Sequence, residues 1–133
     1  KKAFPALICL LKSLTGEITD YLFIDSTPMA VCHTLRERKH KTFKGLAAKG
    51  KTSTGWFFGF KLHMIFNTKG EIIRLSITPG NVGDRTPVPD MMKDINAKLI
   101  GDKGYISKDL FAKLFQQGSM LITKIKKNMK KNH

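Results

Sequence analysis

The chain has 133 residues, 41% of them hydrophobic, and it contains no apolar run approaching the roughly 20 residues that cross a membrane. These values exclude a disordered chain, and they leave room for one domain with a buried core. Lysine and arginine total 24 against 10 aspartate and glutamate residues, which gives a net charge of +14. That excess predicts a polyanionic partner, most often nucleic acid, and strongly salt-dependent binding. A basic surface without any ligand is the alternative.

Two segments concentrate the positive charge. Residues 26–54 contain seven basic side chains against Glu37, and the tail 124–133 adds five lysines and no acid. Neither segment has the pattern of an amphipathic helix, which argues against a membrane surface as the partner. Residues 26–54 also lack a clear period, so we expect a long basic loop inserted in the domain. Loops of this length are usually functional or disordered.

In the first half of the chain, apolar periodicity predicts a short helix followed by three strands. The helix is expected at about 5–14, and the strands at 21–25, 56–66 and 71–78. Residues 67–70 read as a hairpin turn, so the three strands should form an antiparallel meander. In the second strand the even-numbered residues from Trp56 to Phe66 share one face, which is entirely apolar. The odd-numbered residues, which include Lys61 and His63, share the opposite face.

The second half alternates between helices and strands. A helix entered through Pro87 should carry an apolar stripe and be capped by Asp84 or Thr86. A strand at 99–102, a helix at 107–117 capped by Ser107, and a strand at 120–123 follow, and these strands should be parallel. The stripe of the first helix consists of Val88, Met91, Met92 and Ile95.

The expected order, (α)-β-β-β-α-β-α-β, is that of a mixed α/β sheet of the ribonuclease H-like kind, in a single domain over 1–133. In that fold the first and fourth strands are central neighbours, so Asp25 and Asp102 would face each other. Paired carboxylates repel unless a cation lies between them, and Mg²⁺ prefers carboxylate, water and phosphate oxygens. The pair therefore predicts a metal site for phosphodiester chemistry. Turn- or helix-capping roles for Asp25 and Asp102 remain the alternative.

Four short motifs stand in order along the chain: Ile24–Pro28 (IDSTP), Gly59–His63 (GFKLH), Thr78–Arg85 (TPGNVGDR) and Gly101–Tyr105 (GDKGY). Together they resemble motifs of DDE-type insertion-sequence transposases, and the resemblance covers about residues 21–124. It implies a bacterial mobile-element enzyme that cuts DNA and transfers 3′-hydroxyls into target DNA with Mg²⁺ or Mn²⁺. Asp25 matches the family's first catalytic, metal-binding aspartate, and Asp102 matches the second.

The third acid of the family is a glutamate on a helix beyond the last strand, and this chain departs from that pattern. Its last glutamate is Glu71, and Asp109 is the one acid after Asp102. Asp109 should lie in the first turn of the 107–117 helix, where the helix dipole accounts for it. We therefore expect a catalytic domain truncated at both ends, without the region of the third acid and inactive in transposition by itself.

The basic charge and the resemblance together predict side chains that contact DNA. Those near the carboxylates, Lys61 and His63, could equally occupy the solvated side of a strand. Asp84 belongs to a motif as well, although we favour a helix N-cap for it. The complete set of expected DNA contacts is Arg36, Arg38, Lys39, Lys41, Lys44, Lys61, His63 and Lys103.

The leading hypothesis is a transposase that acts on element ends and target DNA, with a homodimer as one option, in the bacterial cytoplasm at the nucleoid. A non-catalytic basic nucleic-acid-binding protein is the alternative. A ribonuclease H-like nuclease with Asp84 as its third ligand is a further one. Cys9 and Cys32 are expected to be reduced thiols, and Cys32, His33 and His40 lack a second ligand pair at zinc spacing.

Overall fold

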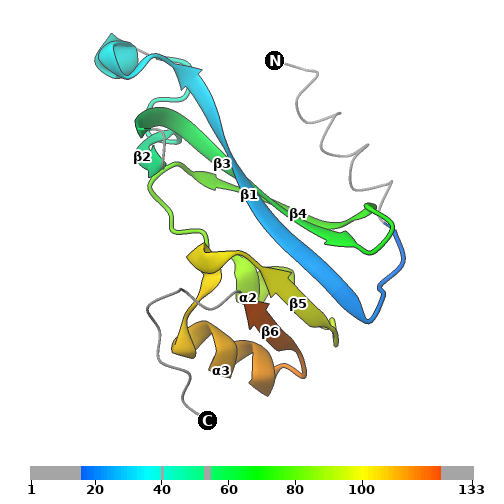
Figure 1. Ribbon diagram of the computed structural model, residues 1–133. Helices are drawn as coiled ribbons and strands as arrows, with labels where there is room; N and C mark the ends of the chain where they lie inside the picture. Colours follow the sequence, from blue (N-terminus) through cyan, green and yellow to red (C-terminus); the bar gives the residue numbers. More distant parts are fainter. Residues whose placement is uncertain (1–15, 40, 53–54, 124–133) are drawn as a thin grey trace.

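A six-stranded mixed sheet forms the centre of the structure, a computed structural model that describes residues 16–39, 41–52 and 55–123 (Figure 1). The helix expected at 5–14, Cys9 and the lysine tail 124–133 lie outside these residues. The strands are β1 (Tyr21–Cys32), β2 (Ala48–Thr52), β3 (Gly55–Asn67), β4 (Ile72–Pro79), β5 (Lys98–Gly101) and β6 (Met120–Thr123). The helical elements are α2 (Val88–Met91), α3 (Lys108–Gln116) and the 3₁₀ turns η1 (Thr34–Lys39) and η2 (Lys103–Tyr105).

The strands are ordered β2-β3-β1-β5-β6, and β4 also pairs with β3. β3 pairs antiparallel with β1, β2 and β4, whereas β5 runs parallel to both β1 and β6. The fold is therefore mixed α+β. Figure 1 shows η1 and β2 at one end of the long β1–β3 pair, and β6 and α3 at the other end.

β1 is longer than the sequence pattern predicts. The expected strand ends at Asp25, but β1 continues through Pro28 to Cys32, and β2 forms a further strand within 26–54. Residues 26–54 are therefore not one continuous loop. Pro28 fits in the strand because β5 pairs only with Tyr21–Phe23, which leaves the edge of β1 beyond Phe23 without a described neighbour. Proline is tolerated at such an edge, where its missing N–H breaks no ladder bond.

The more deeply buried face of β3 is the one with the odd-numbered residues, and not the apolar stripe of even-numbered residues. Trp56 is 60% exposed, while His63 and Ile65 on the other face are fully buried. The reason lies in pairing: Ile65 lies opposite Ile24 of β1, and both belong to the core over which the helices pack. The solvated-strand alternative for His63 is therefore wrong.

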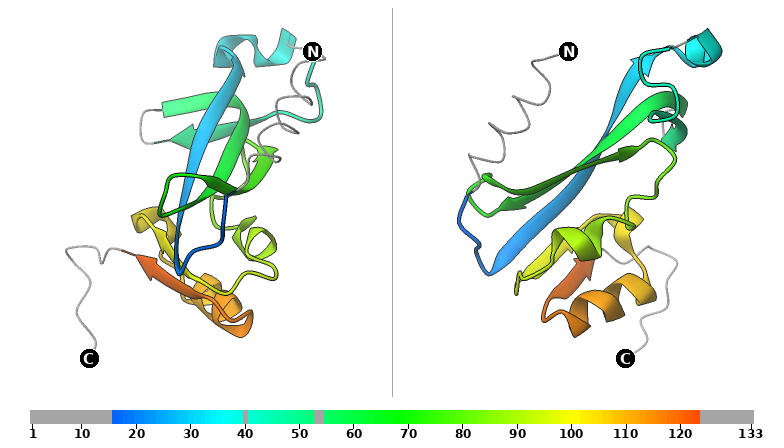
Figure 2. Two further views of the ribbon diagram at one scale, coloured as in Figure 1. Left: turned by 90° about the vertical axis from the view of Figure 1, so that its right-hand side faces the viewer. Right: turned by 180° about the vertical axis from the view of Figure 1, so that it is seen from behind.

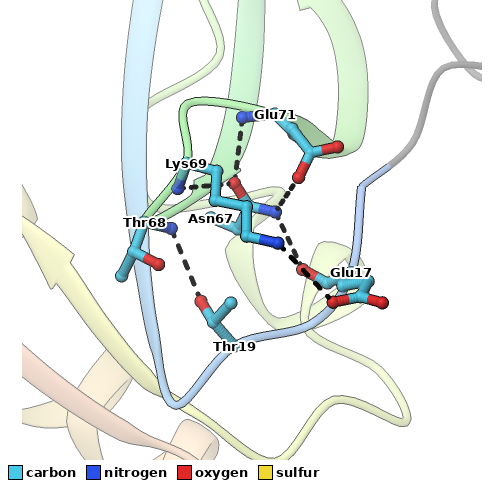
Figure 3. A network of polar contacts seen from close by, with 6 residues as sticks. All are labelled: Glu17, Thr19, Asn67, Thr68, Lys69 and Glu71. Atoms are coloured by element: carbon cyan, nitrogen blue, oxygen red, sulfur yellow. Dashed lines mark hydrogen bonds and ion pairs between the residues drawn. The ribbon is translucent and has the colours of Figure 1, made fainter.

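The predicted hairpin turn between β3 and β4 is confirmed, and Asn67 organises it (Figure 3). The side-chain oxygen of Asn67 accepts hydrogen bonds from the backbone N–H groups of Lys69 and Glu71, at 3.0 and 2.9 Å. Its amide donates to the Glu17 carbonyl and to the Glu71 carboxylate. Gly70 has φ +80°, a left-handed conformation that glycine adopts without strain.

The core lies between the sheet and the two α-helices (Figure 2). α2 contacts β4 and α3, and α3 contacts β6. The apolar stripe predicted around α2 is buried, but the helix itself ends at Met91, and Asp94 takes a positive φ of 62° shortly afterwards. In α3, Ser107 Oγ accepts a hydrogen bond from the Leu110 N–H at 3.2 Å, as predicted for an N-cap. Neither described α-helix has the length and apolar content to cross a membrane.

Candidate active site

The register of β1 and β5 brings Asp25 and Asp102 to equivalent places on neighbouring strands. Phe23 of β1 pairs with Ile100 of β5. Asp25 follows Phe23 by two residues, and Asp102 follows Ile100 by two residues. Because side chains alternate along a strand with a period of two, both aspartates continue the face of Phe23 and Ile100. They also lie where β5 has ended and β1 has an open edge. The sequence prediction that the two carboxylates come from adjacent strands agrees with this pairing.

Asp25 and Asp102 line one cavity of about 480 Å³. Its walls carry three carboxylates and two lysine ammonium groups, so the lining has a formal charge of −1. A larger hollow of about 640 Å³ at the start of β1 has a single carboxylate, Asp20, in its lining. The carboxylate cavity is lined by Asp25, Ser26, Pro28, Lys51, Thr52, Lys61, Asp84, Asp102 and Tyr105.

Each of the two aspartates also accepts a hydrogen bond from a nearby backbone N–H. Oδ1 of Asp25 accepts a hydrogen bond from the Ser26 N–H at 2.8 Å, and Oδ1 of Asp102 accepts one from the Gly104 N–H at 2.8 Å. The turn-forming alternative is therefore correct for Asp102, whose side chain caps η2, whereas Asp25 lies within β1 and caps no turn or helix. Oδ2 of neither aspartate forms a hydrogen bond with a described residue. Both carboxylates are exposed at the cavity, so each keeps an oxygen available for a ligand.

Asp84 enters the cavity as the partner of Lys61 rather than as a helix cap. Lys61 Nζ lies 3.1 Å from Asp84 Oδ1 and donates a hydrogen bond to the Val82 carbonyl at 3.0 Å. The N-cap prediction is wrong, since α2 begins after Pro87 and has no side-chain cap. The Lys61 side chain is 14% exposed, so this ion pair is only partly screened by water.

His63 lies behind the ion pair and is completely buried. Its Nε2 is 2.7 Å from Thr78 Oγ1, while Nδ1 has no hydrogen-bond partner. Burial lowers the pKa of His63 below 6.5; the charge of Asp84 opposes this effect and that of Lys61 adds to it. His63 is therefore neutral at pH 7 and does not offer a charged contact to DNA.

This buried histidine predicts an acid-side loss of stability. As the pH falls below 6.5, the unfolded chain binds a proton at residue 63 before the folded chain does, so the free energy of unfolding decreases. His63→Gln should lose this part of the pH dependence in urea unfolding measured from about pH 7.5 to about pH 5. His33→Gln, at an exposed position, is the matched control and should keep it. An unchanged pH slope in His63→Gln would contradict the prediction.

Tyr105, the last residue of η2, lines the cavity beside Asp102. The side chain is 2% exposed, and its hydroxyl makes no hydrogen bond of good geometry, although Ser26 interacts with it. Burial is the main cause that raises the pKa of Tyr105 to about 12; Ser26 lowers it, and the three cavity carboxylates raise it. The hydroxyl is therefore a protonated donor among negative charges at neutral pH.

The comparison with known families decides what kind of domain carries this site. A sequence model of the family described as "Transposase DDE domain" matches residues 15–133. The chain belongs to this family. No curated protein matches this DDE domain in sequence.

A solved structure resembles the DDE domain in fold. It is the cryo-EM structure of the piggyBac transposase synaptic complex with hairpin DNA, with a TM-score of 0.56 and 13% sequence identity. The match covers 88% of this chain, and the chain spans 25% of the length of that protein. At this identity the likeness shows the fold.

The DDE family implies a divalent metal ion, and the residues at the cavity fit one. Among the described residues, no three histidine, cysteine, aspartate or glutamate side chains are grouped to hold an ion. Mg²⁺, however, is usually held by one or two carboxylates and keeps several waters. Asp25 and Asp102 supply two carboxylates with available oxygens, and Tyr105, whose hydroxyl makes no hydrogen bond of good geometry, lines the same cavity.

The structure separates the expected DNA contacts into two groups. Arg36, Arg38, Lys41 and Lys44 are exposed in and after η1, at the end of β1 farther from α3, and Lys103 is exposed beside Asp102. Lys61 lies inside the cavity. His63 is buried and has no surface to offer, which corrects its prediction as a DNA contact. The side chain of Lys39 lies outside those that the structure describes.

Trp56 is a candidate that the sequence analysis missed. Its ring is 60% exposed, and the ammonium groups of Lys49 and Lys51 lie 5.4 and 5.7 Å from its centre. In the sequence Trp56 looks like the first member of an apolar stripe, and only the pairing of β2 with β3 places the lysines over it. Lys51 also lines the carboxylate cavity, so Trp56 and the cavity share a neighbour.

Proposed function

We propose that this DDE domain is the catalytic domain of a transposase, with Asp25 and Asp102 as its catalytic, metal-binding residues. The observation that carries this proposal is the β1–β5 register, which brings both motif aspartates to one cavity in a domain of this family. When bound, Mg²⁺ or Mn²⁺ would supply Lewis-acid activation of water or a 3′-hydroxyl and stabilise the leaving oxygen.

We infer a ribonuclease H-like core from the strand order. Three antiparallel strands, β1, β3 and β4, are followed by α2, β5, α3 and β6, and β5 returns parallel to β1. The fold likeness to piggyBac transposase supports this inference. In such a core the carboxylates sit where the central parallel strands meet, which is where Asp25 and Asp102 lie.

The chain's own residues would bind and orient the DNA backbone. Lys51 and Lys61 place positive charge beside the three carboxylates, and Lys103 follows Asp102 directly. A phosphate at the cavity would meet the ammonium groups of Lys51 and Lys103, while the oxygens of Asp25 and Asp102 would hold the ion. Asp109 takes no part, because it lies in the first turn of α3 and pairs with Lys113 at 3.2 Å.

Element ends and target DNA are the partners that we propose. The exposed arginines and lysines of η1 and the following residues provide a phosphate-binding surface, whose binding should be salt-dependent. Trp56 adds an exposed aromatic face flanked by Lys49 and Lys51, a combination that stacks on unpaired bases.

Titration of Mg²⁺ or Mn²⁺ by calorimetry tests the proposal. Asp25→Asn and Asp102→Asn should each weaken ion binding at least about tenfold, since each removes a ligand charge. Asp109→Asn removes the same charge away from the cavity and is the matched control, which should bind like the wild type. Wild-type affinity in both Asp25→Asn and Asp102→Asn would overturn the proposal.

A non-catalytic nucleic-acid-binding protein is the second candidate, and the exposed Trp56 with its two lysines favours it as well. It predicts salt-dependent DNA binding together with ion binding that is indifferent to Asp25 and Asp102. DNA binding alone does not separate the two candidates, because the charge predicts it in both. The same ion titration does separate them.

A further inference from the structure

We propose that the Tyr105 hydroxyl donates a hydrogen bond to a water molecule of the divalent ion held by Asp25 and Asp102. Tyr105 would thus be a positioning residue, which orients the hydration shell without touching the ion. The inference rests on the proposed function, because it needs the ion to bind at the two aspartates. It adds a side chain that the family match does not assign.

The backbone of η2 fixes Tyr105 relative to Asp102. The Tyr105 N–H donates to the Asp102 carbonyl at 3.1 Å, and the Asp102 side chain caps the same turn through the Gly104 N–H. The tyrosine ring lies against Gly101, where a Cβ atom would approach the ring within 3.0 Å. The short turn therefore holds the ring and the Asp102 carboxylate as one unit, and both residues line the same cavity.

The hydroxyl lacks the hydrogen bond that a buried polar group normally has. Tyr105 is 2% exposed and its hydroxyl makes no hydrogen bond of good geometry, although Ser26 interacts with it, whereas the large majority of buried side-chain polar atoms are well paired. An unpaired buried hydroxyl destabilises the fold, and phenylalanine would fill the same space without that loss. The hydroxyl is therefore explained best by a ligand that completes its hydrogen bond.

The geometry points to a water molecule as that ligand. The carboxylates of Asp25, Asp84 and Asp102 are close enough to affect the hydroxyl electrostatically, yet none of them hydrogen-bonds to it. A water oxygen between the hydroxyl and a carboxylate would give the hydroxyl a hydrogen bond of better geometry than its contact with Ser26. The cavity of about 480 Å³ has room for several waters, since one water occupies about 30 Å³ in the liquid. An ion held by two carboxylates keeps such waters, and outer donors orient them.

The test compares Tyr105→Phe with the wild type in two measurements on the same chain. Calorimetric titration with Mn²⁺ should show binding weakened by about tenfold, the lower end for loss of an outer hydrogen bond. The urea midpoint without metal should be equal to or above that of the wild type, because the variant removes an unpaired buried hydroxyl. A purely structural hydroxyl would instead lower the midpoint and leave Mn²⁺ affinity unchanged, which would overturn the proposal.

Tyr21→Phe is the matched control, since Tyr21 is the other tyrosine of the chain, is 42% exposed and lies at the start of β1. It should bind Mn²⁺ like the wild type. Wild-type affinity in Tyr105→Phe, together with a loss in Asp25→Asn and Asp102→Asn, overturns the Tyr105 inference and leaves the proposed function standing. Wild-type affinity in both aspartate variants would show that the ion does not bind at Asp25 and Asp102, and it would overturn the proposed function as well as the Tyr105 inference. Normal Mn²⁺ affinity with weakened DNA binding in Tyr105→Phe would assign the hydroxyl to a phosphate and overturn the water assignment.

Discussion

Gly59→Ala is expected to destabilise the protein by about 3 kcal/mol, at the upper end of what overpacking usually causes. Gly59 lies in β3 opposite Ala30 of β1, and a Cβ atom there would overlap the Met29 carbonyl oxygen. The obstacle is the backbone of a paired strand, which cannot rotate away as a flexible side chain could. The Gly59 carbonyl also accepts a hydrogen bond from the Gly80 N–H at 2.9 Å, so a shift of β3 would disturb a second contact.

Urea unfolding of Gly59→Ala measures the effect, and Gly83→Ala is the matched control. A Cβ atom at Gly83 would meet only Thr86 Oγ1, at the ordinary contact distance of 3.6 Å. We expect this control to stay within about 0.5 kcal/mol of the wild type, as surface substitutions usually do. Equal stability of the two variants would show that β1 and β3 are not in close contact at Gly59.

Asp84→Asn is expected to lower the free energy of unfolding by about 2 kcal/mol, because it leaves the Lys61 ammonium group in the cavity without its counter-charge. The expected loss is below the roughly 3–5 kcal/mol of a fully buried pair, since the Asp84 side chain is 36% exposed. Adding Lys61→Met should recover part of the loss, because the unpaired charge disappears. The double variant should therefore be more stable than the sum of the two single changes implies.

A double-mutant cycle by urea unfolding gives the coupling, and about 1 kcal/mol or more is expected for side chains in contact. The pair Asp109–Lys113 on α3 is the control cycle, with side chains 79% and 57% exposed and little coupling expected. Additive effects of Asp84→Asn and Lys61→Met would contradict the role of the pair. The Asp84→Asn protein also addresses the nuclease alternative, which needs Asp84 as a metal ligand and so predicts a loss of Mg²⁺ affinity equal to that of Asp102→Asn.

These variants distinguish the motif residues that stabilise the fold from those that face a ligand at the cavity. Gly59 allows two strands to approach closely, and Lys61 and Asp84 neutralise each other inside the cavity. Asp25 and Asp102 keep an available oxygen at the cavity and accept only local backbone hydrogen bonds. A motif that reads as one functional signal in the sequence therefore contains residues that maintain the fold beside residues that face the ligand.

Local patterns in the sequence were sufficient for the elements whose stability is local. The Asn67 turn, the Ser107 cap of α3 and the buried stripe from Val88 to Ile95 depend on residues close together in the chain. The motifs and the net charge were likewise sufficient to indicate the transposase family, which the family match shows. These inferences required no knowledge of which strands are neighbours.

The tertiary structure decided which face of each strand is covered and which distant side chains meet. The apolar stripe of β3 predicts the wrong buried face, because the position of the helices over Ile24 and Ile65 determines burial and periodicity does not. Lys61 and Asp84 are 23 residues apart and meet only through the course of the chain after β4. The position of Tyr105 beside Asp25 and Ser26 likewise depends on the pairing of β5 with β1. These contacts depend on how distant segments pack together, which a local sequence window does not contain.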